Sequence, residues 1–341
     1  EISSSICFLA LRDSAKISIL ENKKLFSHLL EMCKSSDPEI CRFAIGSLAN
    51  IADDVRLHSS LIKMGCSVEF LLRLMENGVV SVVRESSRAM SNLLTSMDTQ
   101  QEFLKEDGMS VLLDVSKSTD KECVYSTSVA LRKLASNCFA HIYFFDQNGI
   151  EVVMDLSKHD EQNVRIQSAT ALREISSNAE FKLRFVESGA METVFTFFSS
   201  DTVMLKILAM DTLRNLSLSM RLKGTLLRND VVNLTGDCIA HSNNNEDLLF
   251  RCATLIANIA EHAQNKVLLV RMGILHQLVT LCTCTCKSVK MEAARAFSLL
   301  SSAPENADIF DGKIVSTIVG LLDCEEKSAC RDSIAAISNI A

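Results

Sequence analysis

Three cysteines stand two residues apart at Cys282, Cys284 and Cys286. Clustered thiols can hold a soft metal ion or form a disulfide. A structural zinc site needs four ligands, usually spaced pairs of cysteine and histidine, and His276 is the only near candidate to join the three cysteines. We therefore expect a tolerant polar loop here, with a redox-sensitive cysteine pair and a metal site as the alternatives.

Catalytic residues are hard to assemble from this sequence. The seven histidines are scattered, and none stands in a recognisable order with a Ser or Cys nucleophile and an orienting carboxylate. There is no phosphate-binding loop and no GxGxxG motif. The sequence therefore predicts a non-enzymatic protein without a cofactor.

Asparagine recurs in one frame, with an apolar residue two positions before it and another directly after it. The frame occurs at Asn50, Asn92, Asn215, Asn258 and Asn339. It persists with Lys133, Glu174 and Leu299 in place of the asparagine, so neighbouring members are 40 to 43 residues apart. A glycine ahead of an apolar run has the same period, at Gly65, Gly108, Gly149, Gly189, Gly273 and Gly312, with Asp230 in the remaining slot. Two markers that share one period, in an apolar sequence with helical periodicity, indicate a stacked helical-repeat solenoid.

These markers resemble the armadillo repeat, in which each unit has a short first helix, a turn with a glycine, a second helix, a sharp bend and a long third helix. The resemblance covers nearly the whole chain. It implies an all-α, right-handed superhelical solenoid of about eight three-helix repeats of ~41 residues. The related HEAT repeat usually carries a proline in its first helix. The two prolines here, Pro38 and Pro304, lie outside the predicted helices, which favours armadillo.

The repeats are predicted to form a single array over residues 1–341. We place them at 15–54, 55–97, 98–137, 138–178, 179–219, 220–262, 263–303 and 304–341, with 1–14 as the tail of a preceding repeat. Solenoids normally close with polar capping repeats, and neither end of the sequence has one. We therefore expect a fragment of a longer array.

Composition limits the class of protein and its location. The chain is 48% hydrophobic and 23% charged, which is sufficient for a large core. An odd, scattered set of 13 cysteines indicates reduced thiols, and no signal peptide or membrane-spanning run is found. A net charge of −7 does not favour nucleic acid binding. We expect a cytoplasmic protein without direct membrane insertion, held at a membrane surface or ciliary axoneme only through partners or flanking segments.

The resemblance also implies a role for the asparagines. In armadillo proteins the third-helix asparagine lies in a concave groove and bonds the backbone of an extended peptide, because an amide both donates and accepts. This role passes by resemblance to Asn50, Asn92, Asn215, Asn258 and Asn339. The alternative is that these amides bond only to the neighbouring repeat. Nuclear-import receptors add a tryptophan one turn earlier, and the absence of tryptophan here argues against binding of classical import signals.

Arginine forms a second series. Arg132, Arg173 and Arg214 share one register in three consecutive repeats, and Arg88 lies on a neighbouring third helix. Packed helices would place the three about 10 Å apart. Such a strip suits an acidic peptide segment, as in catenin-type grooves. The alternative is that nearby acidic residues pair with these arginines.

The sequence therefore predicts a scaffold that binds an extended segment of a partner protein in the concave groove. The sequence from Asn258 to Gly273 looks most like that of vacuolar-scaffold and ciliary central-apparatus armadillo proteins. Two alternatives stay open. One is a structural array bound laterally into a larger assembly such as an axoneme. The other is a ligand-gated regulatory domain, which needs a deep pocket between repeats lined by aromatic and basic residues.

Overall fold

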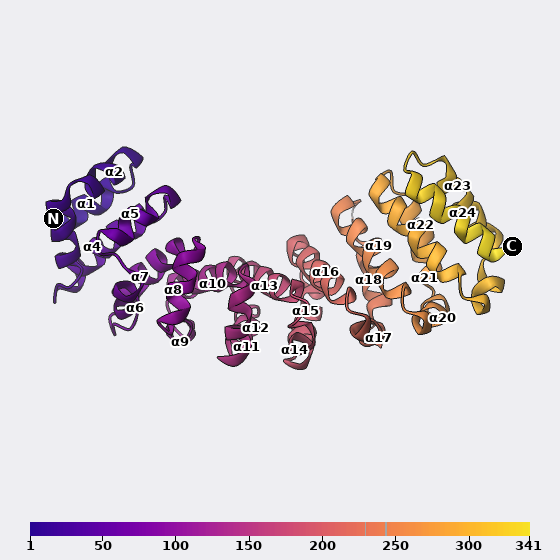
Figure 1. The fold of residues 1–341 in the computed structure, drawn as a ribbon, viewed down its shortest axis with the longest axis horizontal. Coiled ribbons are helices and arrows are strands. Elements are labelled where there is room, and N and C mark those ends of the chain that lie inside the picture. Colours follow the sequence, from indigo (N-terminus) through magenta and orange to yellow (C-terminus); the bar gives the residue numbers. More distant parts are fainter. Residues whose placement is uncertain (229, 243) are drawn as a thin grey trace. The chain divides into compact units, whose positions relative to one another are not determined.

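The computed structural model describes residues 1–228, 230–242 and 244–341, and every regular element in these ranges is a helix. The chain divides into two compact units, unit 1 from Glu1 to Ile175 and unit 2 from Ser176 to Ala341. Figure 1 shows the helices of each unit in succession. The all-α prediction is confirmed, whereas one continuous array with the stated repeat boundaries stays a prediction.

Unit 1 opens with α1 (Ile2–Leu9) and continues in sets of first, second and third helices. These are α2 (Asp13–Glu21), α3 (Lys23–Met32) and α4 (Pro38–Ile51); η1 (Val55–Leu57), α5 (His58–Lys63), α6 (Val68–Met75) and α7 (Val80–Leu93); α8 (Met97–Lys105), α9 (Gly108–Val115) and α10 (Lys121–Ala135); and η2 (Cys138–Ala140), α11 (His141–Asp146), α12 (Gly149–Leu156) and α13 (Gln162–Ser177), which runs two residues into unit 2.

Unit 2 repeats the same order. Its helices are α14 (Lys182–Glu187), α15 (Ala190–Thr196), η3 (Phe197–Ser199) and α16 (Val203–Ser217); α17 (Met220–Arg228), α18 (Val231–Ala240) and α19 (Glu246–Ala260); α20 (Ala263–Arg271), α21 (Ile274–Cys282) and α22 (Lys287–Ser301); and η4 (Pro304–Ile309), α23 (Gly312–Gly320), η5 (Leu321–Asp323) and α24 (Lys327–Ile340).

Short polar side chains start several third helices. Asp120 accepts a hydrogen bond of 3.0 Å from the backbone N–H of Cys123 at the start of α10. Asn245 accepts one of 3.0 Å from Leu248 at the start of α19. Such caps satisfy N–H groups that the first helical turn leaves without a partner. They fix where the polar bend ends and the long apolar helix begins.

Both prolines begin a helix rather than lying outside one. Pro38 is the first residue of α4, and Pro304 is the first residue of η4. The expectation that they lie outside helices is therefore wrong. A proline fits the first helical position because the N–H that it lacks would have no partner inside the helix.

A residue with left-handed backbone joins the first helix of a repeat to the second. The residues in this conformation are Gly65, Asp107, Asn148, Gly189, Asp230 and Gly273, with φ between 54° and 109°. Glycine adopts this conformation without a steric cost, and Asp and Asn tolerate it better than most residues. The glycine marker occupies this left-handed position at Gly65, Gly189 and Gly273, whereas Gly108 and Gly149 directly follow the left-handed residue.

Gly108 meets a different requirement, because it follows the left-handed residue instead of occupying that position. A Cβ added to Gly108 would lie 2.4 Å from the ring of Phe103, which is fully buried. Only glycine lets α9 approach α8 this closely. Phe26, Phe103 and Phe144 in unit 1, and Phe185 and Phe297 in unit 2, are the largest apolar side chains that are fully buried.

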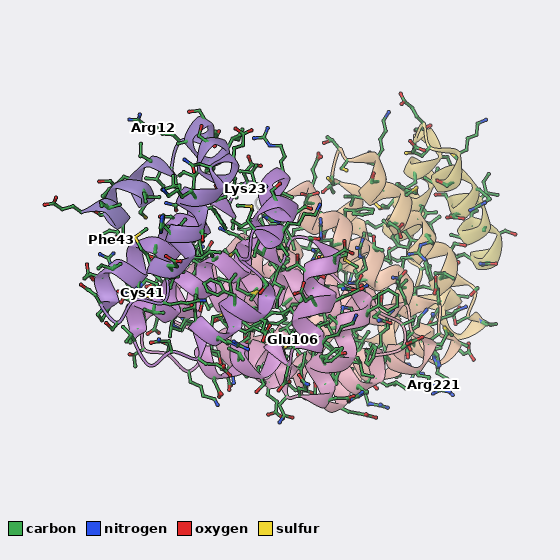
Figure 2. All side chains as sticks on the ribbon, turned by 60° about the vertical axis from the view of Figure 1, so that its left-hand side comes forward. Arg12, Lys23, Cys41, Phe43, Glu106 and Arg221 are labelled. Atoms are coloured by element: carbon green, nitrogen blue, oxygen red, sulfur yellow. The ribbon has the colours of Figure 1, made fainter. Side chains whose placement is uncertain are left out.

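Charged side chains cover the outside of the helices. Arg12 in unit 1 and Arg221 in unit 2 lie at the periphery (Figure 2). No helix among the described residues is both long enough and apolar enough to span a bilayer.

Candidate functional site

The third helices carry all the sequence-predicted binding residues. We call their combined exposed side chains the third-helix surface. In unit 1, α4 packs against α7 and α7 against α10, and in unit 2 the helices α16, α19, α22 and α24 pack in succession. Each unit therefore presents one register position repeatedly along a row of parallel helices.

Every predicted asparagine bonds to the preceding repeat through its amide nitrogen. The hydrogen bonds run from Asn50 to Cys7 O (3.0 Å), from Asn92 to Ala49 O (3.2 Å), from Asn215 to Ser176 Oγ (3.2 Å), from Asn258 to Ser217 Oγ (3.0 Å), and from Asn339 to Ser301 Oγ (3.1 Å). These bonds tie consecutive repeats together. They use the N–H donors that the peptide-binding hypothesis assigns to a partner, so binding of a partner at these five residues stays a prediction.

The amide oxygens divide the asparagines into two classes. Asn50 Oδ1 accepts a hydrogen bond of 2.9 Å from Arg88, and Asn258 Oδ1 accepts one of 2.8 Å from Arg295. In contrast, the Oδ1 atoms of Asn92 and Asn339 accept no hydrogen bond from residues 1–228, 230–242 or 244–341. Asn92 and Asn339 therefore retain an acceptor for a partner's N–H.

Arg88 and Arg295 are equivalent, four residues ahead of the repeating frame position. Arg88 pairs with Glu85 at 2.7 Å, and Arg295 pairs with Glu292 at the same distance. Each arginine therefore joins a carboxylate on its own helix to an asparagine of the preceding repeat. Arg88 was predicted to lie beside a strip of arginines that suits an acidic peptide segment, and this network engages its guanidinium within unit 1.

Lys133 takes the asparagine's place in the first gap of the series. Its Nζ donates to Ser91 O at 2.6 Å and to Thr95 Oγ1 at 2.8 Å, at the end of α7. Burial, together with the neighbouring positive charge of Arg132, lowers the pKa of Lys133 to about 8. The lysine thus makes the same tie between repeats that an asparagine makes elsewhere.

The arginine series is not uniform. Arg132 forms no hydrogen bond or ion pair with any residue that the structure describes, and its side chain is half-buried. Arg173 pairs with Glu174. Arg214 pairs with Asp211 at 3.4 Å, and that carboxylate also receives Arg251 at 2.8 Å. Partner binding at the three arginines stays a prediction, for which Arg132 has the most available guanidinium.

A third periodic position, which sequence reasoning missed, lies on the first helices. We call it the first-helix register. It consists of Lys16, His58, Gln100, His141, Lys182, Lys223, Asn265 and Asn306, all of them buried and 41 or 42 residues apart. The side chains share only a hydrogen-bond donor, so no single residue type marks the position in the sequence.

Five members of the first-helix register bond to a carbonyl six residues earlier, at the end of the preceding third helix. These bonds join His58 to Ala52 O (2.7 Å), Gln100 to Leu94 O (2.8 Å), His141 to Ala135 O (2.7 Å), Asn265 to Ile259 O (3.2 Å) and Asn306 to Leu300 O (2.8 Å). The last carbonyls of a helix have no partner inside it. These five members of the first-helix register therefore supply hydrogen-bond donors to carbonyls at the ends of the third helices that precede them.

The cysteine loop at the end of α21 offers no ligand set. Among the described residues, no group of three or more His, Cys, Asp or Glu side chains is placed to hold a metal ion. Burial raises the pKa of Cys282 to about 12, and the Cys284 sulfur accepts a hydrogen bond of 3.4 Å from the backbone N–H of Cys286.

A cavity of about 390 Å³ lies between the second helices α15 and α18 of unit 2. Its wall includes the aromatic residues Phe195 and Phe198 and the basic residues Lys206 and His241. This is the kind of lining that the ligand-gated alternative requires. None of the five predicted asparagines lines this cavity, whose third-helix wall comes from Lys206 in the first turn of α16.

Comparison with known proteins identifies the fold. The armadillo/beta-catenin-like repeat family matches residues 262–302. No curated protein matches the chain by sequence. An engineered protein from a structural genomics consortium is 24% identical, with a TM-score of 0.86 over 99% of this chain and 84% of that chain.

Two further solved structures share this fold. A designed armadillo repeat protein in complex with the peptide (KR)4 is 19% identical, with a TM-score of 0.58 over 63% of this chain and 91% of that one. A structure concerned with a phosphorylation switch in the interaction between cadherin and beta-catenin is 16% identical. Its TM-score is 0.75 over 93% of this chain and 61% of that chain.

Proposed function

Since this chain is an armadillo-repeat solenoid, we propose that it is a non-enzymatic scaffold that binds an extended, acidic segment of a partner protein along its third helices. The solved structures with this fold include a designed protein in complex with a peptide and one concerned with the interaction between cadherin and beta-catenin, which supports a role in protein interaction. The acidic character of the segment is inferred from this chain's own charges.

The division of charge is the observation that supports this proposal most. The eight third helices carry 16 basic and nine acidic residues, whereas the remainder carries 19 basic and 33 acidic residues. The third helices are thus net basic at +7, in a chain with a net charge of −7. A basic row on an acidic molecule attracts an acidic segment to that row and repels it elsewhere.

On the third-helix surface, α7 and α10 carry the hydrogen-bonding groups that are most available to an acidic partner segment. Arg132 has an unpaired guanidinium that can hold a carboxylate through two parallel hydrogen bonds. Asn92 on the neighbouring helix has a vacant Oδ1 that can accept a backbone N–H. Asn50 and Asn258 have their oxygens engaged by arginine, so we assign them to holding the repeats together.

A charge-matched pair of variants tests the proposal. Arg132→Glu reverses a charge on the third-helix surface, and Arg73→Glu makes the same change on α6, where the arginine side chain is 75% exposed. With fluorescein-labelled oligoglutamate as the probe, we expect Arg132→Glu to weaken binding about tenfold, because a charge-assisted hydrogen bond is lost. Arg73→Glu should change it by less than about twofold.

Two outcomes would contradict the proposal. Equal losses in both variants would mean that overall charge, and not the third-helix surface, governs binding. Tighter binding of oligolysine than of oligoglutamate would reverse the predicted partner class. The predicted location in the cytoplasm, or at a membrane or axoneme through partners, remains a separate prediction.

A further inference from the structure

The sequence contains two asparagines that are directly followed by glycine, both of them in unit 1. Asn77–Gly78 lies in the exposed bend between α6 and α7, whereas Asn148–Gly149 lies at the turn between α11 and α12. Because glycine has no Cβ, its backbone nitrogen can approach the side-chain carbon of the asparagine before it. Each pair is therefore a candidate for deamidation, and the surrounding structure decides which of them reacts.

Gly78 is unhindered within the part of the chain that the structure describes. Apart from its chain neighbours, a Cβ added to Gly78 would meet no described atom within 4 Å, and both Asn77 and Gly78 are exposed. The Gly78 N–H donates no hydrogen bond to any described residue. The nitrogen is thus available to reach the Asn77 side chain, and its proton is accessible to water.

Gly149, in contrast, is packed into the fold. It is buried, and a Cβ at this position would lie 3.1 Å from the Cα of Phe144. Asn148 has left-handed backbone, with φ of 60° and ψ of 20°, directly before the first residue of α12. Ring closure between Asn148 and Gly149 would turn their peptide bond against the packing of α11 on α12, so it requires local unfolding.

The structural role of Asn77 does not require an asparagine. Its Oδ1 accepts a hydrogen bond of 2.9 Å from the backbone N–H of Val79, directly before α7 begins. Serine hydroxyls accept from the N–H two residues later at the equivalent bends of other repeats, at Ser35 (3.2 Å), Ser118 (3.1 Å) and Ser200 (3.1 Å). The bend therefore needs only an acceptor here, and the asparagine adds a reactive amide that the fold does not use.

We propose that Asn77 is a deamidation site, at which the chain converts asparagine to aspartate and isoaspartate with water as the only other reactant. In the first step the Gly78 nitrogen loses its proton to solvent hydroxide and attacks Asn77 Cγ. Ammonia leaves as a five-membered succinimide ring closes, and its extra proton comes from water, which restores the hydroxide. In the second step water opens the ring. Cleavage of the bond at Cγ gives aspartate, and cleavage at the backbone carbonyl gives isoaspartate.

The two products differ in their effect on the bend. Aspartate keeps an oxygen that can accept from Val79, and it adds a negative charge ahead of α7, where the helix dipole favours it. Isoaspartate routes the main chain through the side-chain carbons, which lengthens it by one carbon and displaces the acceptor. We therefore expect the isoaspartyl form to loosen the first turn of α7, the helix that carries Arg88 and Asn92.

Peptide mass spectrometry tests the proposal after incubation of the folded chain in heavy-oxygen water at mildly alkaline pH, because each deamidation takes up one solvent oxygen. We expect deamidation at Asn77 to be at least about tenfold faster than at Asn148, since only the second site requires local unfolding. In urea the two rates should become similar, because the dipeptides are the same. Hydrogen exchange at the start of α7 (80–83) should be faster in the isoaspartyl fraction than in the unreacted chain.

Two variants sharpen the test. Asn77→Ser copies the residue of the equivalent bends, so it should abolish the reaction and leave the midpoint of urea unfolding unchanged. Gly78→Ala should slow the reaction about tenfold, because a methyl group then shields the attacking nitrogen. This variant should fold normally, since Gly78 has open space for a Cβ and lies outside the left-handed region.

Three results would overturn the proposal. They are equal rates at Asn77 and Asn148 in the folded chain, a difference between these sites that persists in urea, or an unchanged rate in Gly78→Ala. The first two are measured on the unaltered chain, so they do not depend on how well a variant folds. Binding of oligoglutamate to the third helices is a separate measurement, and either proposal can fail without the other.

Discussion

The two units place a buried donor at the same register of their first helices, but they build it from different side chains. Unit 1 uses Lys16, His58, Gln100 and His141, whereas unit 2 uses Lys182, Lys223, Asn265 and Asn306. Neutral imidazoles alternate with other donors in unit 1, and unit 2 combines two lysines with two amides. The fold therefore requires a hydrogen-bond donor at this position and not a particular residue type.

The choice of donor changes how each unit is connected. In unit 2, Lys223 pairs with Glu261, and the second oxygen of that carboxylate receives Arg295 at 2.9 Å. Arg295 also bonds Asn258, so ionic groups link the first-helix register to the third-helix surface. In unit 1, Gln100 bonds Leu94 O and Lys133 O and accepts from Asn137 at 2.9 Å. The equivalent connection there is made through neutral amides.

The largest effect is expected from removal of the amide at Gln100. Gln100→Leu leaves two carbonyls and the Asn137 amide without this partner, so we expect a loss of about 3 kcal/mol in the free energy of unfolding. Asn306→Leu in unit 2 removes bonds to Leu300 O and Lys266 O and should cost about 2 kcal/mol.

Urea unfolding measures both values, with Gln101→Leu as the control. Gln101 is exposed and next to Gln100, so its replacement should change stability by less than about 0.5 kcal/mol. Equal results for Gln100→Leu and Gln101→Leu would break the comparison, because the register would then contribute no hydrogen-bond energy.

Acidification should distinguish the units next. Burial lowers the pKa of His58 and of His141, and both histidines belong to unit 1. As pH falls through the ordinary histidine pKa of about 6.5, the unfolded chain takes up protons that the folded unit does not. Stability of unit 1 is therefore kept above that pH and lost below it, whereas Asn265 and Asn306 of unit 2 do not titrate.

Hydrogen exchange of peptides from each unit at pH 7 and pH 5 measures this difference. The matched variant replaces both histidines by glutamine, the residue that unit 1 already uses at Gln100. We expect the acid-induced loss of protection in unit 1 to shrink in His58→Gln/His141→Gln. An unchanged loss would assign the acid sensitivity to other groups.

A smaller effect, of equal size in both units, is expected for the arginine–asparagine hydrogen bond that the two units share. Arg88 donates to the amide oxygen of Asn50 in unit 1, and Arg295 donates to that of Asn258 in unit 2, each through a terminal guanidinium nitrogen and at distances of 2.9 and 2.8 Å. Double-mutant cycles of each pair with alanine should give coupling energies of about 1 kcal/mol in both units. A coupling near zero in one unit would show that the shared geometry does not carry a shared energy.

Much of the fold was predictable because its periodicity lies in the sequence. Asn50, Asn92 and Asn258 mark third helices, since the apolar frame around each asparagine is buried in the row of packed helices. The glycine marker was also informative, although Gly108 serves a close helix approach and Asp107 supplies the left-handed turn. Such local patterns are visible in the sequence because the backbone geometry at each position limits which residue types fit there.

The candidate site was less predictable because it depends on contacts between repeats. The sequence places Arg88 and Asn50 on separate helices, and only the folded structure shows that the guanidinium donates a hydrogen bond to the amide oxygen. The first-helix register uses lysine, histidine, glutamine and asparagine, so its period has no signature in residue type.

The smallest effect concerns the turn before each second helix, where the units again use different residues for one conformation. Unit 1 has Gly65, Asp107 and Asn148 in the left-handed region, and unit 2 has Gly189, Asp230 and Gly273 there. Replacing Asp230 by glycine removes backbone strain but loosens the unfolded chain, and these effects oppose each other. We expect a net change within about 0.5 kcal/mol in urea unfolding, whereas Gly273→Val should destabilise unit 2 by more than about 1 kcal/mol because φ is 87° at that position. Equal tolerance of both changes would mean that the backbone of this turn does not constrain its residue, and the glycine period would then need another explanation.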